Sequence, residues 1–266
     1  MAHRIAVCNQ KGGVGKTTTS VNLAAALALR GGRALLVDMD PQAHATLGLG
    51  VDRSTLQVSV YEAMVEAQRV NEAILKDRAE NLDLLPASVS LAGGEVELID
   101  AEEREFRLNK ALSLVDSNYR YIVIDCPPSL GLLTLNCLVA VQGVLIPVQA
   151  EYLAMEGMSR LLDTMNLVRQ GLNMSLSIEG VLITMYSSRL SLAQQVAEEV
   201  RSFFREQVFD TVIPRSVRLA EAPSFGKTIF GYDAHSAGAQ AYLALADELL
   251  ARHAPARRAA SIEETQ

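Results

Sequence analysis

The chain has 266 residues, of which 49% are apolar and 5% aromatic, and its formal net charge at pH 7 is −7. This composition predicts a soluble globular chain with one sizeable core, and the acidic balance does not by itself indicate a nucleic-acid-binding protein. The most apolar window, residues 131–148, is interrupted by Asn136, Gln142 and Pro147, so we expect no signal peptide and no transmembrane segment.

The first elements along the chain are a short apolar strand at residues 4–8, a glycine-rich loop and an alanine-rich helix at 16–30. The loop reads Gln10-Lys11-Gly12-Gly13-Val14-Gly15-Lys16-Thr17. It meets the phosphate-loop pattern G-x-x-x-x-G-K-[ST] except at the first glycine, where Gln10 stands. A glycine loop that merely turns the chain would not need this strand and this helix around it, so we predict a phosphate site.

The chemistry of such a loop follows from its residue types. Glycines let the backbone curl until successive N–H groups point inward at an anion, and the start of the following helix adds the positive end of its dipole. Lys16 can then reach the outer phosphates, and the hydroxyl of Thr17 can bind a magnesium ion. The second lysine, Lys11, is not part of the generic motif and needs its own explanation.

Two further strands, at 34–37 and 121–124, end in acidic residues, namely Asp38 and Asp40 after the first and Asp125 after the second. In an open parallel sheet, ligands bind beyond the carboxyl ends of the strands. These aspartates are therefore placed to hold magnesium or to orient a water. A strand-end aspartate can also cap a helix or form a turn. We favour the metal role for Asp125, whereas for Asp40, which precedes a proline, the turn is the stronger interpretation of the residue alone.

The rest of the chain alternates between strands and helices. Further strands are expected near 82–85, 143–148, 178–184 and 209–213, and further helices near 55–66, 95–114, 130–138, 152–170, 193–205 and 236–252. The alternation predicts one α/β domain over residues 1–253, with a mostly parallel twisted sheet covered by helices on both faces. Residues 254–266 are small and polar, and we expect this tail to be disordered.

Taken together, these motifs resemble those of the deviant Walker A P-loop ATPases of the MinD/ParA superfamily, and in particular the ParA/Soj chromosome-partitioning proteins. The matching segments run in family order from near the first residue to about residue 250. They are residues 11–18, 38–42, 124–131, 146–149, 180–184, 212–215 and 219–227. The resemblance implies the P-loop NTPase fold.

The resemblance also implies a role for each matching residue. Three would be catalytic: Lys16 on the chain's own phosphates, Lys11 reaching across a dimer to the partner's phosphates, and Asp40 positioning the attacking water. Magnesium would lie among Thr17, Asp38 and Asp125. The nucleotide would contact Lys11, Gly12, Gly13, Val14, Gly15, Lys16, Thr17 and Thr18 through its phosphates, and Met185, Pro214 and Ser216 through its adenine.

The function implied is an ATP-dependent dimerising switch, a magnesium-dependent ATPase that hydrolyses ATP to ADP and phosphate. The ATP dimer would bind DNA nonspecifically and drive chromosome or plasmid partitioning, and a centromere-binding protein of the ParB/Spo0J type would stimulate hydrolysis. Such a protein is cytoplasmic and nucleoid-associated. The alternative is a MinD-like or other cargo-positioning ATPase. Because the tail lacks the apolar face of a membrane-surface helix, we expect no membrane partner.

Charge alone leaves the DNA contacts open. Residues 62–105 hold twelve acidic and four basic residues, whereas residues 185–232 hold six basic and five acidic ones. The second segment could form a mildly positive face or simply a mixed, solvated surface. The resemblance favours DNA contacts by Arg189, Arg218 and Lys227. The chain departs from the family pattern at 187–188 and 234–237, where the family usually carries more charged residues.

The cysteines and histidines suggest no further cofactor. Cys8, Cys126 and Cys137 lie in apolar surroundings without C-x-x-C spacing, which indicates buried reduced thiols and argues against an electron-transfer ATPase with an iron–sulfur cluster. The four histidines are scattered along the chain, and we expect no metal site from them. They are His3, His44, His235 and His253.

Overall fold

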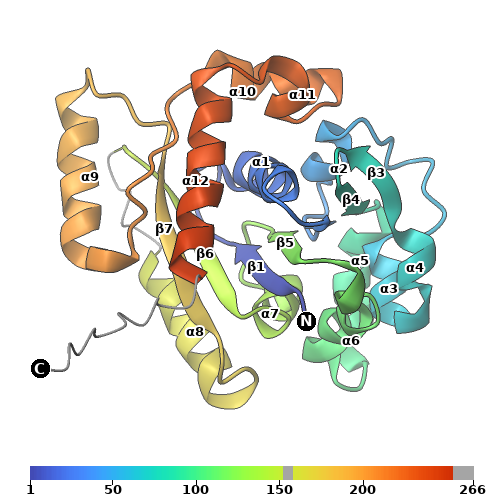
Figure 1. The fold of residues 1–266 in the computed structure, drawn as a ribbon. Coiled ribbons are helices and arrows are strands. Elements are labelled where there is room, and N and C mark those ends of the chain that lie inside the picture. The colour runs from blue at the N-terminus through green and yellow to red at the C-terminus, as the bar shows by residue number, and fades with distance from the viewer. Residues whose placement is uncertain (152–157, 254–266) are drawn as a thin grey trace, which may run out of the picture.

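The computed structural model describes residues 1–151 and 158–253, and it shows an α/β fold around one seven-stranded sheet (Figure 1). The strand order is β3-β4-β2-β5-β1-β6-β7. The strands are β1 (His3–Val7), β2 (Ala34–Asp38), β3 (Leu75–Ala79), β4 (Leu82–Leu85), β5 (Tyr121–Asp125), β6 (Gly143–Gln149) and β7 (Ser177–Thr184). Every pairing in the sheet is parallel except that of β3 with β4, which confirms the predicted mostly parallel sheet.

Helices cover both faces of this sheet, as the sequence predicts. The α-helices are α1 (Lys16–Leu29), α2 (His44–Gly48), α3 (Val60–Val65), α4 (Val70–Ala73), α5 (Ser90–Glu97), α6 (Arg107–Ser113), α7 (Leu132–Val139), α8 (Met158–Gly171), α9 (Ser191–Phe204), α10 (Val217–Glu221), α11 (Ile229–Asp233) and α12 (Ala237–His253). On β2, Leu36 packs into the core under α1 and α12, whereas Leu35 and Val37 pack into the core on the other face. The central strands β2, β5 and β6 are largely apolar because both of their faces are buried.

The order of the strands places the acidic strand ends beside the glycine loop. After β1 the chain moves to β2 and β4 on one side of the sheet, and later it adds β6 and β7 on the other side. In the register of the sheet, Asp125 at the end of β5 lies opposite both Val7 of β1 and Asp38 of β2. The loop that follows Val7 and the two carboxylates therefore share one edge, at a switch point where such sheets bind ligands.

The predicted strand at 209–213 is wrong. The segment runs beside β7, where the backbone N–H groups of Phe209 and Ile213 donate to carbonyl oxygens of β7 but no continuous ladder forms, only an isolated bridge at Val208 and another at Pro214. Its middle is held by a side chain, because the backbone N–H groups of Asp210 and Thr211 donate to the carboxylate of Glu248 at 2.8 and 2.9 Å. These contacts with α12 take the place of a strand ladder.

Three other expectations need correction. The charged strand β3 is absent from the prediction, and its polar sequence is the type that protects an exposed sheet edge.

The predicted helix at 95–114 is broken into α5, two short 3₁₀ turns and α6, with Glu103 in the left-handed region at φ 49°. The predicted helix at 55–66 begins at Val60, after a capping box formed by Ser59 and Glu62. The tail at 254–266 and the start of the predicted helix at 152–170 lie outside the described residues.

Candidate functional site

The glycine loop lies between β1 and α1 and has the backbone conformation that its sequence predicts. Gly13 and Gly15 have φ angles of 75° and 88°, in the left-handed region that residues with a β-carbon disfavour. Gly15 is also the N-cap of α1, whose first N–H groups consequently face the loop. Unpaired backbone donors and the helix dipole thus converge on one place.

Two buried side chains fix this loop to the neighbouring strands. Asn9 accepts a hydrogen bond from the backbone N–H of Lys11 at 2.9 Å and donates to the carbonyl oxygen of Pro147 on β6 at 2.7 Å. Thr184, the last residue of β7, donates to the carbonyl oxygen of Val14 at 2.8 Å. The loop is therefore held rigidly without any ligand.

The two lysines of the loop differ in their contacts. Lys16 is buried, and its Nζ donates to the carbonyl oxygen of Lys11 at 3.1 Å, so its ammonium group lies over the loop. The side chain of Lys11 is half-buried and makes no ion pair or hydrogen bond to any other described residue. The charge of Lys16 is thus directed into the site, whereas that of Lys11 is available to a group outside this chain.

Asp125 carries an unsatisfied buried oxygen. Its Oδ1 accepts a hydrogen bond from the hydroxyl of Ser20 at 2.8 Å, whereas its Oδ2 has no hydrogen-bond partner among the described residues. Burial, followed by the nearby carboxyl of Asp38, raises the pKa of Asp125, and the hydroxyls of Thr17 and Ser20 oppose this shift. A cation next to Oδ2 and Thr17 would compensate the buried charge, so these residues fit a magnesium ion.

Asp38 has a different environment, although it too is fully buried. Its Oδ1 accepts from the backbone N–H of Asp40 at 3.2 Å, and its Oδ2 accepts from both the N–H and the hydroxyl of Thr46, at 2.8 and 2.7 Å. Burial raises the pKa of Asp38, and the bonds from Thr46 lower it. These contacts fix the turn between β2 and α2. A direct metal contact by Asp38 stays a prediction.

Asp40 lies at the mouth of the site and is 8% exposed. Its Oδ1 accepts from the backbone N–H of Gln42 at 2.9 Å, which is the turn contact expected of an aspartate before Pro41. It also lines a cavity of about 430 Å³ together with Lys16 and Thr17. The turn role and the predicted water-positioning role are therefore compatible.

Two adjoining cavities make up the site. The first, of about 430 Å³, is lined by Gly12, Gly13, Gly15, Lys16, Thr17, Thr18, Asp40, Gln42, His44, Pro128 and Met185. The second, of about 340 Å³, is lined by Gly15, Thr18, Thr184, Met185, Ile213, Pro214, Arg215, Ser216, Val217, Leu219, Ala220 and Tyr242. They share Gly15, Thr18 and Met185. A space that contains charged and hydroxyl groups thus adjoins one that is largely apolar.

Several residues that build this site were not predicted from the sequence. Ser20 lies one helical turn after Lys16, a spacing that places both on one face of α1 and could have identified it. Tyr242 lines the second cavity from α12, and its hydroxyl pairs with that of Thr19 at 3.1 Å. Thr46 and Asn9 are polar residues whose roles follow only from contacts made by folding.

The predicted DNA contacts are all exposed, but their surroundings differ. Arg189 lies in the loop between β7 and α9 and forms no ion pair within the described part of the chain. Arg218, on α10, pairs with Glu221 at 3.1 Å and Asp233 at 3.5 Å, so part of its charge is already compensated. Lys227 lies just before α11. DNA contact by these residues stays a prediction.

The three cysteines are buried and free, as expected. A hydrogen bond with Cys126, followed by burial, raises the pKa of the Cys8 thiol, whereas burial, followed by a hydrogen bond with Cys137, raises the pKa of the Cys126 thiol. Across residues 1–151 and 158–253, no helix combines the length and the apolar character that crossing a bilayer requires.

Comparisons with known proteins agree with this geometry. Residues 2–178 match the family model described as an AAA domain. The chain is 55% identical over 251 residues to the sporulation initiation inhibitor protein Soj of Bacillus subtilis (94% of this chain and 99% of the relative), and 52% identical to the chromosome partitioning protein ParA of Myxococcus xanthus (94% and 89%).

Solved structures share the fold. The crystal structure of cobyrinic acid a,c-diamide synthase from Mycobacterium smegmatis, with bound ADP and magnesium, is 39% identical with a TM-score of 0.83, covering 94% of each chain. The septum site-determining protein MinD of Pyrococcus horikoshii, complexed with Mg-ADP, is 27% identical with a TM-score of 0.72, covering 94% of this chain and 96% of MinD.

Proposed function

Because the chain belongs to the ParA/Soj family of chromosome-partitioning ATPases, we propose that it is a magnesium-dependent ATPase that uses its nucleotide state as a switch. The observation that carries this proposal is the pair of adjoining cavities joined at Gly15, Thr18 and Met185. The triphosphate lies over the loop amides in the polar cavity, and the adenine lies in the apolar one, against Met185, Pro214 and Ser216. Thr17 and Asp125 would hold magnesium, which would neutralise charge on the phosphates.

Hydrolysis to ADP and phosphate requires charge neutralisation and an aligned water. Lys16 and the loop amides contribute the first, because they lie on the floor of the phosphate cavity. Asp40 contributes the second, since its carboxylate lines the same cavity and is close to solvent. These roles follow the family pattern and the positions of the side chains.

Lys11 links hydrolysis to dimerisation in this proposal. Its side chain has no partner among the described residues, and it extends from a loop that is itself fixed by Asn9. In a two-fold dimer it reaches the phosphates bound by the second copy, so ATP stabilises the interface and hydrolysis releases it. The ATP dimer then binds DNA nonspecifically through Arg189, Arg218 and Lys227, and a ParB/Spo0J-type protein stimulates hydrolysis. In the cell, the protein acts in the cytoplasm on the nucleoid.

Binding to a labelled DNA duplex of arbitrary sequence, measured by fluorescence anisotropy with ATP and with ADP, tests this proposal. We expect binding only with ATP and magnesium, falling steeply as salt rises, because phosphate contacts release counterions. Arg189→Glu should weaken it strongly, and Arg218→Glu less, since Arg218 is already paired with two acids. Arg160→Glu, a charge reversal at an exposed position on α8, is the matched control. If the ATP form binds no duplex at low salt, the partitioning role is wrong and the MinD-like alternative takes its place.

A further inference from the structure

Folding brings together two histidines that are far apart in the sequence. The Nε2 atom of His3 lies 3.0 Å from Oε2 of Glu179, and the Nε2 atom of His253 lies 2.6 Å from Oε1 of the same carboxylate. The two imidazole rings are 4.1 Å apart, centre to centre. His3 and His253 are thus scattered along the sequence but close together in the fold.

The cluster lies where the strands begin, at the end of the sheet opposite the nucleotide site. His3 begins β1, Glu179 is near the start of β7, and His253 is the last residue of α12. The glycine loop and Asp125, in contrast, follow the carboxyl ends of their strands. A ligand bound by this cluster is therefore separate from the nucleotide and its magnesium.

The position of the Glu179 carboxylate is built into the fold. Its side chain is only 7% exposed, and in the described part of the chain its ion-pairing partners are the two histidines. It packs over Gly143, the first residue of β6, where any β-carbon would collide with Oε2. The cluster thus differs from an exposed surface pair, because a buried carboxylate is directed toward two converging ring nitrogens.

We infer that His3, Glu179 and His253 form a second cation site, one that takes Zn²⁺ or a similar transition-metal ion. The donor set is two imidazole nitrogens and one carboxylate, which suits zinc, whereas magnesium requires oxygen ligands. One ligand atom from each residue lies within 4.8 Å of the other two. Tetrahedral zinc with bonds of 2.0–2.2 Å needs donor atoms about 3.4 Å apart. Small side-chain movements would bring the three donor atoms to that spacing.

The surroundings also suit a metal. The side chains of His3 and His253 are 29% and 31% exposed, so an ion can enter from solvent and a water can serve as the fourth ligand. Without metal, each ring donates a proton to the one carboxylate. With metal, both nitrogens present lone pairs instead.

The bound ion would tie α12 to the sheet. It would link the last residue of the helix to the starts of β1 and β7, whereas Tyr242 near the other end of the helix lines the cavity proposed for adenine. The consequence is therefore stabilisation of the folded chain by mass action, growing with the logarithm of the zinc concentration above Kd.

Titration of the full, untagged chain with ZnCl₂ in millimolar Mg²⁺, followed by calorimetry, tests this inference. We expect one zinc per chain, and visible d–d bands of tetrahedral Co²⁺ when CoCl₂ replaces zinc. His3→Ala and His253→Ala should each lower the affinity at least about 100-fold, since even loss of a residue that only orients a ligand costs 10–100-fold. His235→Ala, which alters an exposed histidine elsewhere, should leave binding unchanged.

Thermal unfolding of each variant with and without ZnCl₂ separates metal binding from structural damage. A variant that folds less stably still tests the site, because the shift caused by zinc is read within that variant. A zinc shift retained in His3→Ala and His253→Ala, or no zinc binding by the wild type at micromolar concentrations, overturns the inference. The three residues would then be a hydrogen-bonded clasp only. Neither result depends on whether the chain hydrolyses ATP.

Discussion

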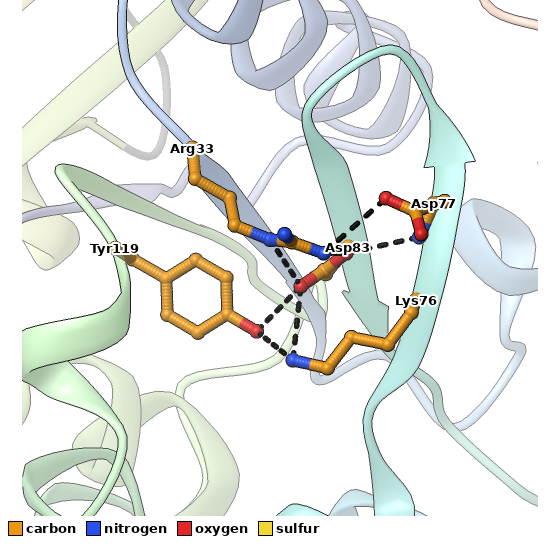
Figure 2. A network of polar contacts seen from close by, with 5 residues as sticks. All are labelled: Arg33, Lys76, Asp77, Asp83 and Tyr119. Atoms are coloured by element: carbon orange, nitrogen blue, oxygen red, sulfur yellow. Dashed lines mark hydrogen bonds and ion pairs between the residues drawn. The ribbon is translucent and has the colours of Figure 1, made fainter.

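A strand carboxylate is buried at each of the two ends of the parallel strands, which are called the two edges of the sheet here. The two carboxylates differ in how completely they are hydrogen-bonded. At the edge away from the nucleotide site, Asp83 of β4 accepts bonds from Arg33 at 3.0 Å, Lys76 at 3.1 Å, Tyr119 at 2.7 Å and the backbone N–H of Asp77 at 2.9 Å (Figure 2). Every lone pair there has a donor. The network joins the starts of three strands and needs no ligand.

At the other edge, Oδ1 of Asp125 accepts a bond from the Ser20 hydroxyl, and its Oδ2 has no partner among the described residues. The pKa values reflect this contrast. Burial raises the pKa of Asp83, but the bonds from Arg33 and the others outweigh it and lower the value to about 2, whereas burial and Asp38 raise the pKa of Asp125. At the first edge, all hydrogen-bonding groups of the carboxylate are paired in the folded chain, and we call this edge complete. At the second, incomplete edge, one carboxylate oxygen is unpaired among the described residues, so a bound ligand and its cation would stabilise it.

The largest effect is expected from the loop lysines. Lys16→Ala removes the charge directed over the phosphate cavity and should abolish useful ATP binding, by at least about 100-fold, or 2.7 kcal/mol. Lys11→Ala should bind nucleotide nearly as well as the wild type, because its side chain has no partner among the described residues. Equilibrium binding of a fluorescent ATP analogue measures both. Equal losses in the two variants would rule out the cross-dimer role of Lys11.

Asp40→Ala should separate binding from hydrolysis. The substitution removes a carboxylate that lines the phosphate cavity but no phosphate donor. We expect the rate of phosphate release to fall by about 100-fold or more, with ATP affinity little changed. Asp52→Ala, at an acidic position on the loop after α2, is the control. A variant with weakened ATP binding would show that Asp40 acts through the turn instead.

Asp83→Asn probes the complete edge. The amide keeps the shape of the side chain but loses the charge that several donors share, so we expect the free energy of unfolding to fall by about 2 kcal/mol. Nucleotide affinity should not change. Asp77→Asn is the matched control, since its side chain is 76% exposed and makes a surface pair with Arg33. Urea denaturation measures both variants, and equal small losses would show that the buried network contributes little.

The lowered pKa of Asp83 also predicts that the stability of the protein depends on pH. Its folded pKa of about 2 lies below its ordinary value of 3.8, so its contribution to stability is present above pH 4 and is lost as pH falls toward 2. The difference in unfolding free energy between wild type and Asp83→Asn should therefore shrink between pH 5 and pH 3, as measured by denaturation at each pH. A constant difference would assign the loss to packing.

The smallest effect on stability is expected at Asp125. Asp125→Asn replaces a buried carboxyl group that is only partly hydrogen-bonded with a neutral amide, so the ligand-free chain should be unchanged or up to about 1 kcal/mol more stable. Magnesium-dependent nucleotide binding should weaken in the same variant. Thermal unfolding with and without Mg-ADP measures both quantities. Marked destabilisation of the ligand-free chain would show that Asp125 is a structural residue like Asp83.

The glycine loop was predictable from sequence because its chemistry is local. Gly13, Gly15 and Lys16 are neighbours in one strand–loop–helix unit, and the pattern specifies the backbone. Asp125 was predictable because parallel strands end at the same edge.

Contacts between distant segments were not predictable in this way. His3 and His253 meet only because β1 begins and α12 ends beside Glu179. No periodicity in the sequence indicates this contact. The failure at 209–213 has the same origin, since the carboxylate of Glu248 on α12 takes the N–H groups in the middle of the segment, while those at its two ends pair with β7. Local patterns predict elements, whereas these features depend on tertiary contacts.

The mass of the protein in solution, measured by light scattering on a gel-filtration column, tests the central claim most directly. If the incomplete edge is finished by ATP, magnesium and the partner's Lys11, the wild type should elute as a dimer with ATP and as a monomer of 28.8 kDa with ADP. Lys11→Ala should remain a monomer with ATP. A dimer that forms equally with ADP, or one that Lys11→Ala still forms, would contradict the account.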